Sequence, residues 1–323
     1  PTSFWPENVS RVIQGYDRPL TSLLQDAAHR YPEKTYTIFQ GATRTFAQVQ
    51  DTAHKVAAFL YAQGVRKGDR VAIFLPNLPQ YPPIFFGILQ IGAVCVTCNP
   101  LYTASELRYQ LQDAEATVVF CMDHPQFYET AVAAIQDTEV HTMVVCNIKS
   151  CLPKTKACIG GLLGKIPKAP SHNPDHVFFD HLLSAHYAQP PEVDIDPSND
   201  PALIIYTGGT TGVPKGAVLT HSNFVYEVMA LEEWVRFPQG DGPPAEPITH
   251  GGDLCFLGVL LWYQIFGMTL CLLGACHSAS RLICIPDPRA GTPPFTEVLQ
   301  AVQRYKPTLL VAVPTIFSPF INH

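Results

Sequence analysis

The chain has few charged residues, and this scarcity excludes several classes of protein. Only 15% of its 323 residues are charged, against roughly 25% in an average globular chain. Its 21 basic side chains are outnumbered by 27 acidic ones, so the net charge is −6 and no basic field is available to neutralise a nucleic-acid backbone. We therefore expect no nucleic-acid partner. With 47% hydrophobic residues, the chain is expected to bury a large core rather than to be disordered.

Neither a secretory signal nor a disulfide framework is visible. The amino terminus lacks the charged start and apolar core of a signal peptide. Most of the ten cysteines lie in or beside apolar runs, where a free thiol behaves as a small hydrophobe. Cysteines in apolar runs, without a disulfide framework, favour a reducing, cytoplasmic compartment. Cys95 and Cys98 have redox or zinc spacing, but no second pair accompanies them, and the surrounding "AVCVTCNP" favours a buried strand.

One uncharged stretch is long enough to span a bilayer. Residues 254–276 form a run of 23 residues without a formal charge. A transmembrane helix is one interpretation, and a strand, "LCFLGVLLWY", followed by a buried helix, "FGMTLCLLGACHSA", is the other. A glutamine near the centre of the run favours the second interpretation. We therefore expect part of an α/β core here.

Apolar strands and helices alternate along the chain. Residues 70–76 read as a strand and residues 79–93 as an apolar helix. Thr103 and Glu106 have the spacing of a capping box and predict the start of a helix. The alternation resumes after residue 201 and ends in a predicted strand over residues 308–314. Such alternation is typical of parallel βαβ units with helices on both faces of a sheet.

We therefore predict an α/β fold of two successive layered αβα subdomains with mostly parallel sheets, over residues 1–148 and 201–323. Residues 149–200 are rich in proline and glycine and predict a linker or surface excursion. The start of this segment is basic. One interpretation of this basic part is a peripheral contact with the inner face of a membrane, and the other is a mobile solvated loop. Its lysines are Lys149, Lys154, Lys156, Lys165 and Lys168.

The stretch "YTGGTTGVPKGAVLTH" over residues 206–221 lies between two expected strands. Glycines let the backbone approach a ligand with several N–H groups facing one anion. Threonine hydroxyls add donors and Lys215 adds a positive charge, so the stretch predicts a phosphate-binding loop. It is not a Walker loop, because Pro214 precedes Lys215, and it is not a dinucleotide fingerprint, because a strand follows. The candidate residues are Thr207, Gly208, Gly209, Thr210, Thr211, Gly212 and Lys215.

This loop resembles the phosphate-loop signature of the AMP-forming acyl-adenylating enzymes. Its Tyr-Thr-Gly-Gly start resembles the long-chain fatty acid:CoA ligase branch, and residues 45–120, with "NPLYT" before a Glu-Leu helix, are similar to the first half of those ligases. The resemblance implies the large domain of the adenylating-enzyme fold. It also implies that a fatty acid reacts with ATP and Mg²⁺ to give an acyl-adenylate, which the thiol of coenzyme A then captures. Thr207 and Lys215 are the implied catalytic residues.

The stretch "LLWYQIFGMT" resembles the next core motif of that family. The resemblance implies that its residues bind the acyl substrate or gate its tunnel, and ordinary core packing is the alternative. Many family members have histidine at the position of Gln264, and glutamine can donate a hydrogen bond but cannot become a cation. The candidate substrate-binding residues are Tyr263, Gln264, Phe266, Gly267 and Met268.

The family continues beyond the part that matches here. Its later elements supply adenine, ribose and magnesium contacts and a small domain with a catalytic lysine. The resemblance therefore implies that this chain is an amino-terminal portion, incomplete at its carboxyl end and catalytically incomplete alone. Two alternatives stay open. One is an aryl-acid or luciferase-like adenylating enzyme, and the other is a non-catalytic module that binds acyl groups or nucleotides.

Overall fold

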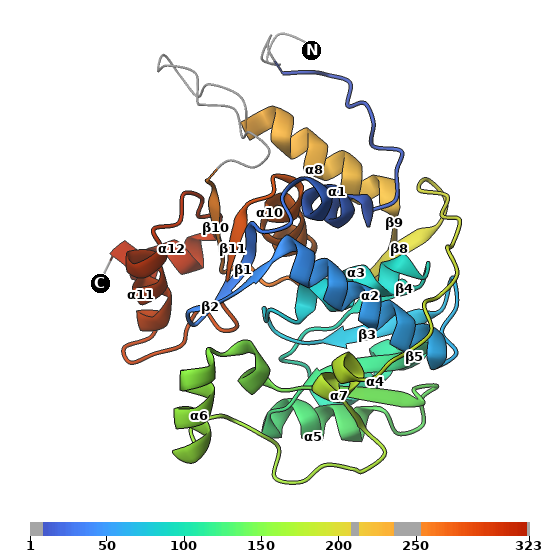
Figure 1. Cartoon of the computed structure of the whole chain (residues 1–323), viewed down its shortest axis with the longest axis vertical. Helices are drawn as coiled ribbons and strands as arrows, with labels where there is room; N and C mark the ends of the chain where they lie inside the picture. Colours follow the sequence, from blue (N-terminus) through green and yellow to red (C-terminus); the bar gives the residue numbers. More distant parts are fainter. Residues whose placement is uncertain (1–8, 208–212, 236–252, 322–323) are drawn as a thin grey trace.

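The computed structural model describes residues 9–207, 213–235 and 253–321. These residues form two sheets with helices packed against them (Figure 1). The larger sheet has the strand order β7-β6-β5-β3-β4-β8-β9 and the smaller one the order β10-β11-β1-β2. Among the described strands, the pairs β1–β2 and β8–β9 are antiparallel and the other pairs are parallel. The predicted α/β class with mostly parallel sheets is confirmed.

The strands of the larger sheet are β3 (Arg70–Phe74), β4 (Val94–Thr97), β5 (Ala116–Met122), β6 (Thr142–Cys146), β7 (Val177–Phe178), β8 (Pro201–Thr207) and β9 (Lys215–Thr220). Those of the smaller sheet are β1 (Thr35–Phe39), β2 (Ala42–Thr45), β10 (Cys255–Gly258) and β11 (Arg281–Cys284).

The first helices are α1 (Ser22–Arg30), α2 (Phe46–Ala62), α3 (Tyr81–Gln90), α4 (Ala104–Asp113), α5 (Pro125–Ala134), α6 (Lys154–Leu162) and α7 (Phe179–Ser184). The later ones are α8 (His221–Val235), α11 (Thr296–Tyr305) and α12 (Pro314–Ile321), with one continuous helix made of α9 (Ile265–Gly267), a π-helical turn η2 (Met268–Leu273) and α10 (Gly274–His277).

Each sheet takes strands from both sides of the boundaries predicted at residues 148 and 201. Strand β8 pairs with β4, and β1 pairs with β11. The two sheets therefore interleave along the chain instead of following one another, which corrects the predicted succession of two layers. Local periodicity could not indicate this, because it shows that a segment is a strand but not which strand lies beside it.

Two cores cover the two faces of the larger sheet. Along β3, Val71 and Ile73 join a core that also holds side chains of α2 and α3. Ala72 and Phe74 join a second core with α4 and α5 on the opposite face. Successive side chains of a strand point to opposite faces, so a sheet covered on both sides has strands that are apolar throughout. The first core also includes the smaller sheet, which ties the two sheets together.

Helix α4 begins as the sequence predicts. Thr103 accepts a hydrogen bond from the backbone of Glu106, and the Glu106 carboxylate accepts one from the backbone of Thr103, so the capping box is complete. The hydrogen bonds that the Glu106 carboxylate accepts from the backbone and the hydroxyl of Thr103 lower its pKa. The cap fixes the orientation of α4, whose side chains contact the candidate site described below.

The strand predicted over residues 308–314 is wrong. Leu309 forms only an isolated bridge with Phe256, and Pro314 already begins α12. Strand β10, which would have to pair with this segment, ends at Gly258. Because no described strand continues beside residues 310–312, their apolar side chains pack against the core without a ladder of backbone hydrogen bonds.

Residues 254–276 form strand β10 and most of the helix over residues 265–277, as the strand-and-helix interpretation predicted. Within the described ranges, no helix combines the length and the apolar character that crossing a bilayer requires. The segment over residues 149–200 contains α6, β7 and α7. Strand β7 adds an edge to the larger sheet, so part of the predicted linker belongs to the fold.

We expect Gly87 to be essential where α3 packs on α2. A Cβ atom at this position would lie 2.7 Å from the carbonyl oxygen of Ala53 and 2.8 Å from Cβ of Val56. Gly87→Ala should push the helices apart and lower the free energy of unfolding by about 1–3 kcal/mol in a urea titration. Gly161→Ala is the matched control, because its Cβ would find no atom closer than 3.9 Å. Equal losses in both variants would refute this account.

Candidate functional site

The two ends of the predicted phosphate loop are held together by strand pairing. Thr207 at the end of β8 lies opposite Lys215 at the start of β9. Both side chains are exposed, so the hydroxyl and the ammonium group are free to meet a ligand. The middle of the loop lies outside the described residues, and this covers the candidates Gly208, Gly209, Thr210, Thr211 and Gly212.

Helix α4 holds both strands of this hairpin. The hydroxyl of Tyr206 donates a hydrogen bond to the Asp113 carboxylate at 2.6 Å, and the hydroxyl of Tyr109 donates to the Pro214 carbonyl at 3.1 Å. Burial and the neighbouring carboxylate raise the pKa of Tyr206, so its hydroxyl keeps the proton it donates. A side chain at Gly216 would collide with Ile204 and approach the Tyr206 ring. Helix α4 therefore fixes the hairpin from one side.

The loop follows the carboxyl end of β8, beside the carboxyl end of β4. Thr97 ends β4 and is buried, and its hydroxyl donates a hydrogen bond at 3.0 Å to the carbonyl of Tyr263. The predicted acyl-binding segment is thereby attached to the strand next to the loop. Ligands of open α/β sheets bind in the crevice outside the carboxyl ends of the strands. The structure thus brings both predicted segments to one edge of the sheet.

Asn77, which follows β3, binds the residues just before Tyr263 through its side chain. Its side-chain amide donates to the carbonyls of Gly258 at 3.0 Å and Leu260 at 2.7 Å. Its side-chain oxygen accepts from the backbone N–H of Trp262 at 2.9 Å. Asn77 is only 1% exposed, so these three hydrogen bonds lie inside the core and fix the position of residues 258–262 over the larger sheet.

The five predicted substrate-binding residues divide by exposure. Gly267 and Met268 are buried in the core, and a Cβ on Gly267 would lie 2.3 Å from the Leu261 carbonyl, so packing explains both. Tyr263 is half-buried, and burial, with a smaller effect of Tyr102, raises its pKa. Gln264 and Phe266 are exposed, and these two are free to contact a ligand.

Phe266 lines an apolar groove beside the hairpin. The groove has a volume of about 410 Å³ and lies between the start of the helix over residues 265–277 and the β9–α8 segment. Leu219 of β9 and Phe224 of α8 form the opposite wall. Lys215 begins the strand that carries Leu219, so the groove adjoins the hairpin that holds the loop. Its lining residues are Leu219, Asn223, Phe224, Glu227, Ile265, Phe266, Thr269 and Leu270.

Sequence reasoning missed several residues of this region. Thr97 and Tyr109 lie in a strand and a helix whose patterns indicate only secondary structure. Leu219 and Phe224 read as ordinary apolar positions. No local signal distinguishes them, because their neighbours in the site are far away in the chain. The "NPLYT" motif, which includes Tyr102, was the available indication that this part of the chain reaches the site.

Described residues include no group of three or more histidine, cysteine or acidic side chains that could hold a metal ion. The pair Cys95 and Cys98 is fully buried in and after β4, as the strand interpretation predicted. Burial raises the pKa of both thiols well above the ordinary value, which leaves them unreactive. All ten cysteines are free, and Cys158 is the one that is exposed.

His221, which follows β9, is a buried neutral histidine. Its Nδ1 accepts a hydrogen bond from the backbone N–H of Leu20 at 3.1 Å, and Nε2 has no hydrogen-bond partner in the described structure. Burial lowers its pKa from the ordinary 6.5 to about 4, against a smaller opposing effect of Asp200. The contact ties the start of α8, and with it one wall of the groove, to the turn before α1.

We expect this histidine to make the fold sensitive to acid. Below pH 6.5 the unfolded chain binds a proton that folded His221 takes up only near pH 4, so stability falls as the pH falls through this window. Between about pH 7 and pH 5 the loss should be about 2 kcal/mol. His221→Asn keeps an acceptor for Leu20 and should remove this loss in urea titrations at the two pH values, whereas exposed His141→Asn should not. An unchanged pH dependence in His221→Asn would contradict the prediction.

Comparison with known proteins identifies the family of this chain. Residues 24–323 match the family model described as AMP-binding enzyme. The chain is 31% identical to a long-chain-fatty-acid–CoA ligase of Bacillus subtilis over 99% of its own length and 54% of the relative's. It therefore spans about half the length of such relatives.

Solved structures show the same fold. A long-chain-fatty-acid-CoA ligase from Archaeoglobus fulgidus superposes with a TM-score of 0.74 at 21% identity, over 99% of this chain and 56% of that one. The anthranilate CoA ligase AuaEII, in complex with anthranoyl-AMP, superposes with a TM-score of 0.73 at 20% identity, over 94% and 51%. Since the family model covers nearly the whole chain, this chain belongs to the AMP-binding enzyme family.

Proposed function

We propose that a protein containing this chain is an AMP-forming long-chain fatty acid:CoA ligase. The observation that carries the proposal is the apolar groove beside the Thr207–Lys215 hairpin. An apolar groove next to this hairpin is what an enzyme needs in order to hold a hydrocarbon chain beside phosphate groups, and it supports the proposal. The 31% identity to the Bacillus subtilis ligase over 99% of the chain supports it.

The proposed reaction has two steps. In the first, a carboxylate oxygen of the fatty acid forms a bond to the α-phosphorus of ATP, and the bond from that phosphorus to the bridging oxygen of pyrophosphate breaks. In the second, the thiol of coenzyme A loses its proton and bonds to the acyl carbon, and AMP leaves. Negative charge grows on the departing pyrophosphate during the first step, so fixed donors beside it lower the barrier.

Thr207 and Lys215 are the proposed catalytic residues of the first step. The pairing of β8 with β9 holds both at the mouth of the loop, where the ammonium group of Lys215 would neutralise phosphate charge. The residues between them, Gly208 to Gly212, are proposed to donate backbone N–H and hydroxyl hydrogen bonds to the same phosphates. Glycine at these positions permits the close approach that such contacts need.

The hydrocarbon chain is proposed to lie in the groove lined by Phe266, Leu219 and Phe224. Exposed Gln264 would donate a hydrogen bond to the carboxyl group. Tyr263, Gly267 and Met268 would act by positioning this segment, since the first is attached to Thr97 and the other two are packed in the core.

ATP and coenzyme A are the proposed co-substrates. Magnesium would enter bound to the ATP phosphates, where it neutralises charge. Because the described residues offer no group of side chains suited to a metal, we assign no step to the ion. The free state of all ten cysteines supports a reducing, cytoplasmic site of action.

The test is acid-dependent AMP formation with ATP, magnesium and coenzyme A, measured on the longest natural polypeptide that contains this chain. Short, medium and long fatty acids and aryl acids are compared. Preference for long fatty acids supports the proposal. Preference for aryl acids would assign the chain to another branch of adenylating enzymes, and ligand binding without AMP formation would indicate a non-catalytic module.

The groove predicts a selective loss with one substitution. Phe266→Ser removes an apolar wall, so kcat/KM for long acids should fall about tenfold while that for short acids changes little. Phe317→Ser is the matched control, because Phe317 of α12 is similarly exposed, 38% against 45% for Phe266, and does not line the groove. An equal fall for short and long acids would place the hydrocarbon chain elsewhere.

A further inference from the structure

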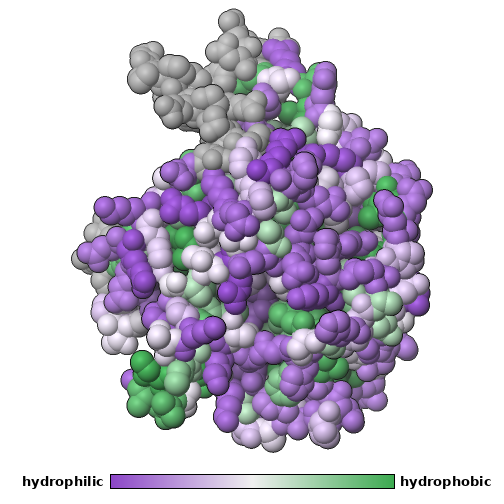
Figure 2. All heavy atoms as spheres, viewed as in Figure 1, coloured by the Kyte–Doolittle hydropathy of each residue, from purple (hydrophilic) through white to green (hydrophobic). Residues whose placement is uncertain are grey.

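Helix α6 and the residues after it carry an unusual set of exposed apolar side chains. Ile159 is 58% exposed, Leu162 83% and Leu163 61%. No residue of α6 is buried. In Figure 2 these hydrophobic side chains form a green patch at the lower left, where Figure 1 shows α6. A helix that leaves its apolar residues in water gains nothing from them in folding, which points to a role in contact with something else.

The same segment is strongly basic within an acidic protein. Residues 149–168 contain five lysines and no acidic residue, although the chain has a net charge of −6. Lys156 is engaged, because its ammonium group donates to the Gln40 carbonyl at 2.8 Å. The other four are exposed, and within the described ranges they make neither a hydrogen bond nor an ion pair. These are Lys149, Lys154, Lys165 and Lys168.

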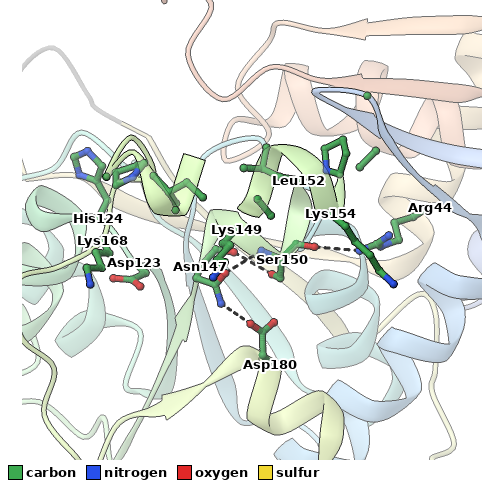
Figure 3. Close-up of a pocket in the computed structure, with 18 of the residues that line it drawn as sticks. Arg44, Asp123, His124, Asn147, Lys149, Ser150, Leu152, Lys154, Lys168 and Asp180 are labelled. Atoms are coloured by element: carbon green, nitrogen blue, oxygen red, sulfur yellow. Dashed lines mark hydrogen bonds between the residues drawn. The ribbon is translucent and has the colours of Figure 1, made fainter. Parts of the chain in front are cut away.

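Three of these lysines line a cavity beside α6 (Figure 3). The cavity has a volume of about 1230 Å³ and also holds Arg44. Its two carboxylates are already occupied: that of Asp123 accepts from Ala169 and His172, and that of Asp180 accepts from Asn147. The lysine ammonium groups are therefore available to an anion from outside.

We propose that residues 149–168 form a docking surface for a membrane containing anionic phospholipid. Ile159, Leu162 and Leu163 would enter the interfacial layer of the membrane, and the surrounding lysines would contact the phosphate headgroups. Exposed apolar side chains among lysines, in a segment that itself contains no acidic residue, match such a surface in both polarity and charge. The cavity beside α6 gives a headgroup room to meet Lys149, Lys154 and Lys168. The inference does not depend on the proposed ligase activity.

Co-sedimentation of the whole 323-residue chain with lipid vesicles tests the proposal. The chain should bind vesicles that contain phosphatidylglycerol, should bind pure phosphatidylcholine far less, and should be released by added salt. Leu162→Ser with Leu163→Ser should weaken binding roughly tenfold or more. Lys154→Glu with Lys165→Glu should weaken it by at least about 25-fold, since each lysine near an anionic surface contributes about fivefold.

Matched controls separate this surface from general effects. Val12→Ser changes another exposed apolar residue, 66% exposed, and Lys55→Glu reverses a lysine of α2 that lies outside the segment. Both should bind like the unchanged chain. Because α6 buries no side chain and the substituted residues outside it are exposed or half-exposed, all four variants should keep the thermal midpoint of the unchanged chain, so a loss of binding would not reflect unfolding.

Cys158 supplies an independent measurement. It lies within α6 and is the exposed one of ten cysteines, so a polarity-sensitive fluorophore attached there reports on this face. Its emission should shift to the blue with anionic vesicles only. The proposal is overturned if the unchanged chain ignores these vesicles or if the α6 variants bind as well as it does. A third outcome also overturns it: the unchanged chain sediments as a dimer, and the Leu162→Ser, Leu163→Ser variant sediments as a monomer. The apolar face would then be a contact between two copies of the chain.

Discussion

Replacing Lys215 with alanine is expected to slow adenylation about 10²- to 10³-fold while leaving the fold intact. Charge develops on the departing pyrophosphate, and the loss of one preorganised donor at such a position costs about 3–4 kcal/mol of transition-state stabilisation. The side chain is exposed, and the backbone of Lys215 stays paired with Thr207 in the variant. The measurement is fatty-acid-dependent pyrophosphate release by the natural polypeptide that contains this chain.

Two variants control this experiment. Lys215→Arg keeps the positive charge and should retain more activity than Lys215→Ala, although its planar group differs in shape. Lys55→Ala removes a half-exposed lysine far from the hairpin in the chain, whose ammonium group pairs with the Asp51 carboxylate at 3.0 Å, and should change nothing. Pyrophosphate release at the unchanged rate in Lys215→Ala would remove this lysine from the proposed mechanism.

Replacing Asn77 with leucine is expected to lower the free energy of unfolding by about 3–5 kcal/mol. The variant leaves the carbonyls of Gly258 and Leu260 and the N–H of Trp262 without the partner they have now. Each buried polar group without a partner costs about 1–3 kcal/mol. The site is only 1% exposed, so water cannot easily replace the amide. Urea unfolding of the 323-residue chain followed by circular dichroism measures the loss.

Two further asparagine variants sharpen this test. Asn77→Asp keeps the size and one acceptor, yet it places a carboxylate opposite two carbonyls, so it should be at least as destabilising. Asn199→Leu is the control, because Asn199 is exposed and bonds only to neighbouring Asp196. It should change stability by less than about 0.5 kcal/mol. If Asn77→Leu lowered the free energy of unfolding by less than about 0.5 kcal/mol, the hydrogen bonds of Asn77 would not be what holds the two sheets together.

The sequence alone determined the local structure. Alternating apolar runs predicted β3, β4, β5, β6, β8 and β9, and the Thr103–Glu106 spacing predicted the cap of α4. The glycine-rich stretch between two strands indicated the hairpin that holds Thr207 opposite Lys215. Each of these features depends on residues that are near one another in the chain, because propensity, periodicity and capping act over a few residues.

Only the tertiary structure decided which distant residues meet. It placed β8 beside β4, so that Thr97 reaches Tyr263 across 166 positions of the chain. It also brought Leu219 and Phe266 to one groove and left the apolar residues of α6 in solvent. A run of apolar residues predicts that a segment is buried, but it does not indicate which other segments it packs against. That choice is made by packing and strand pairing, which compete over the whole chain at once.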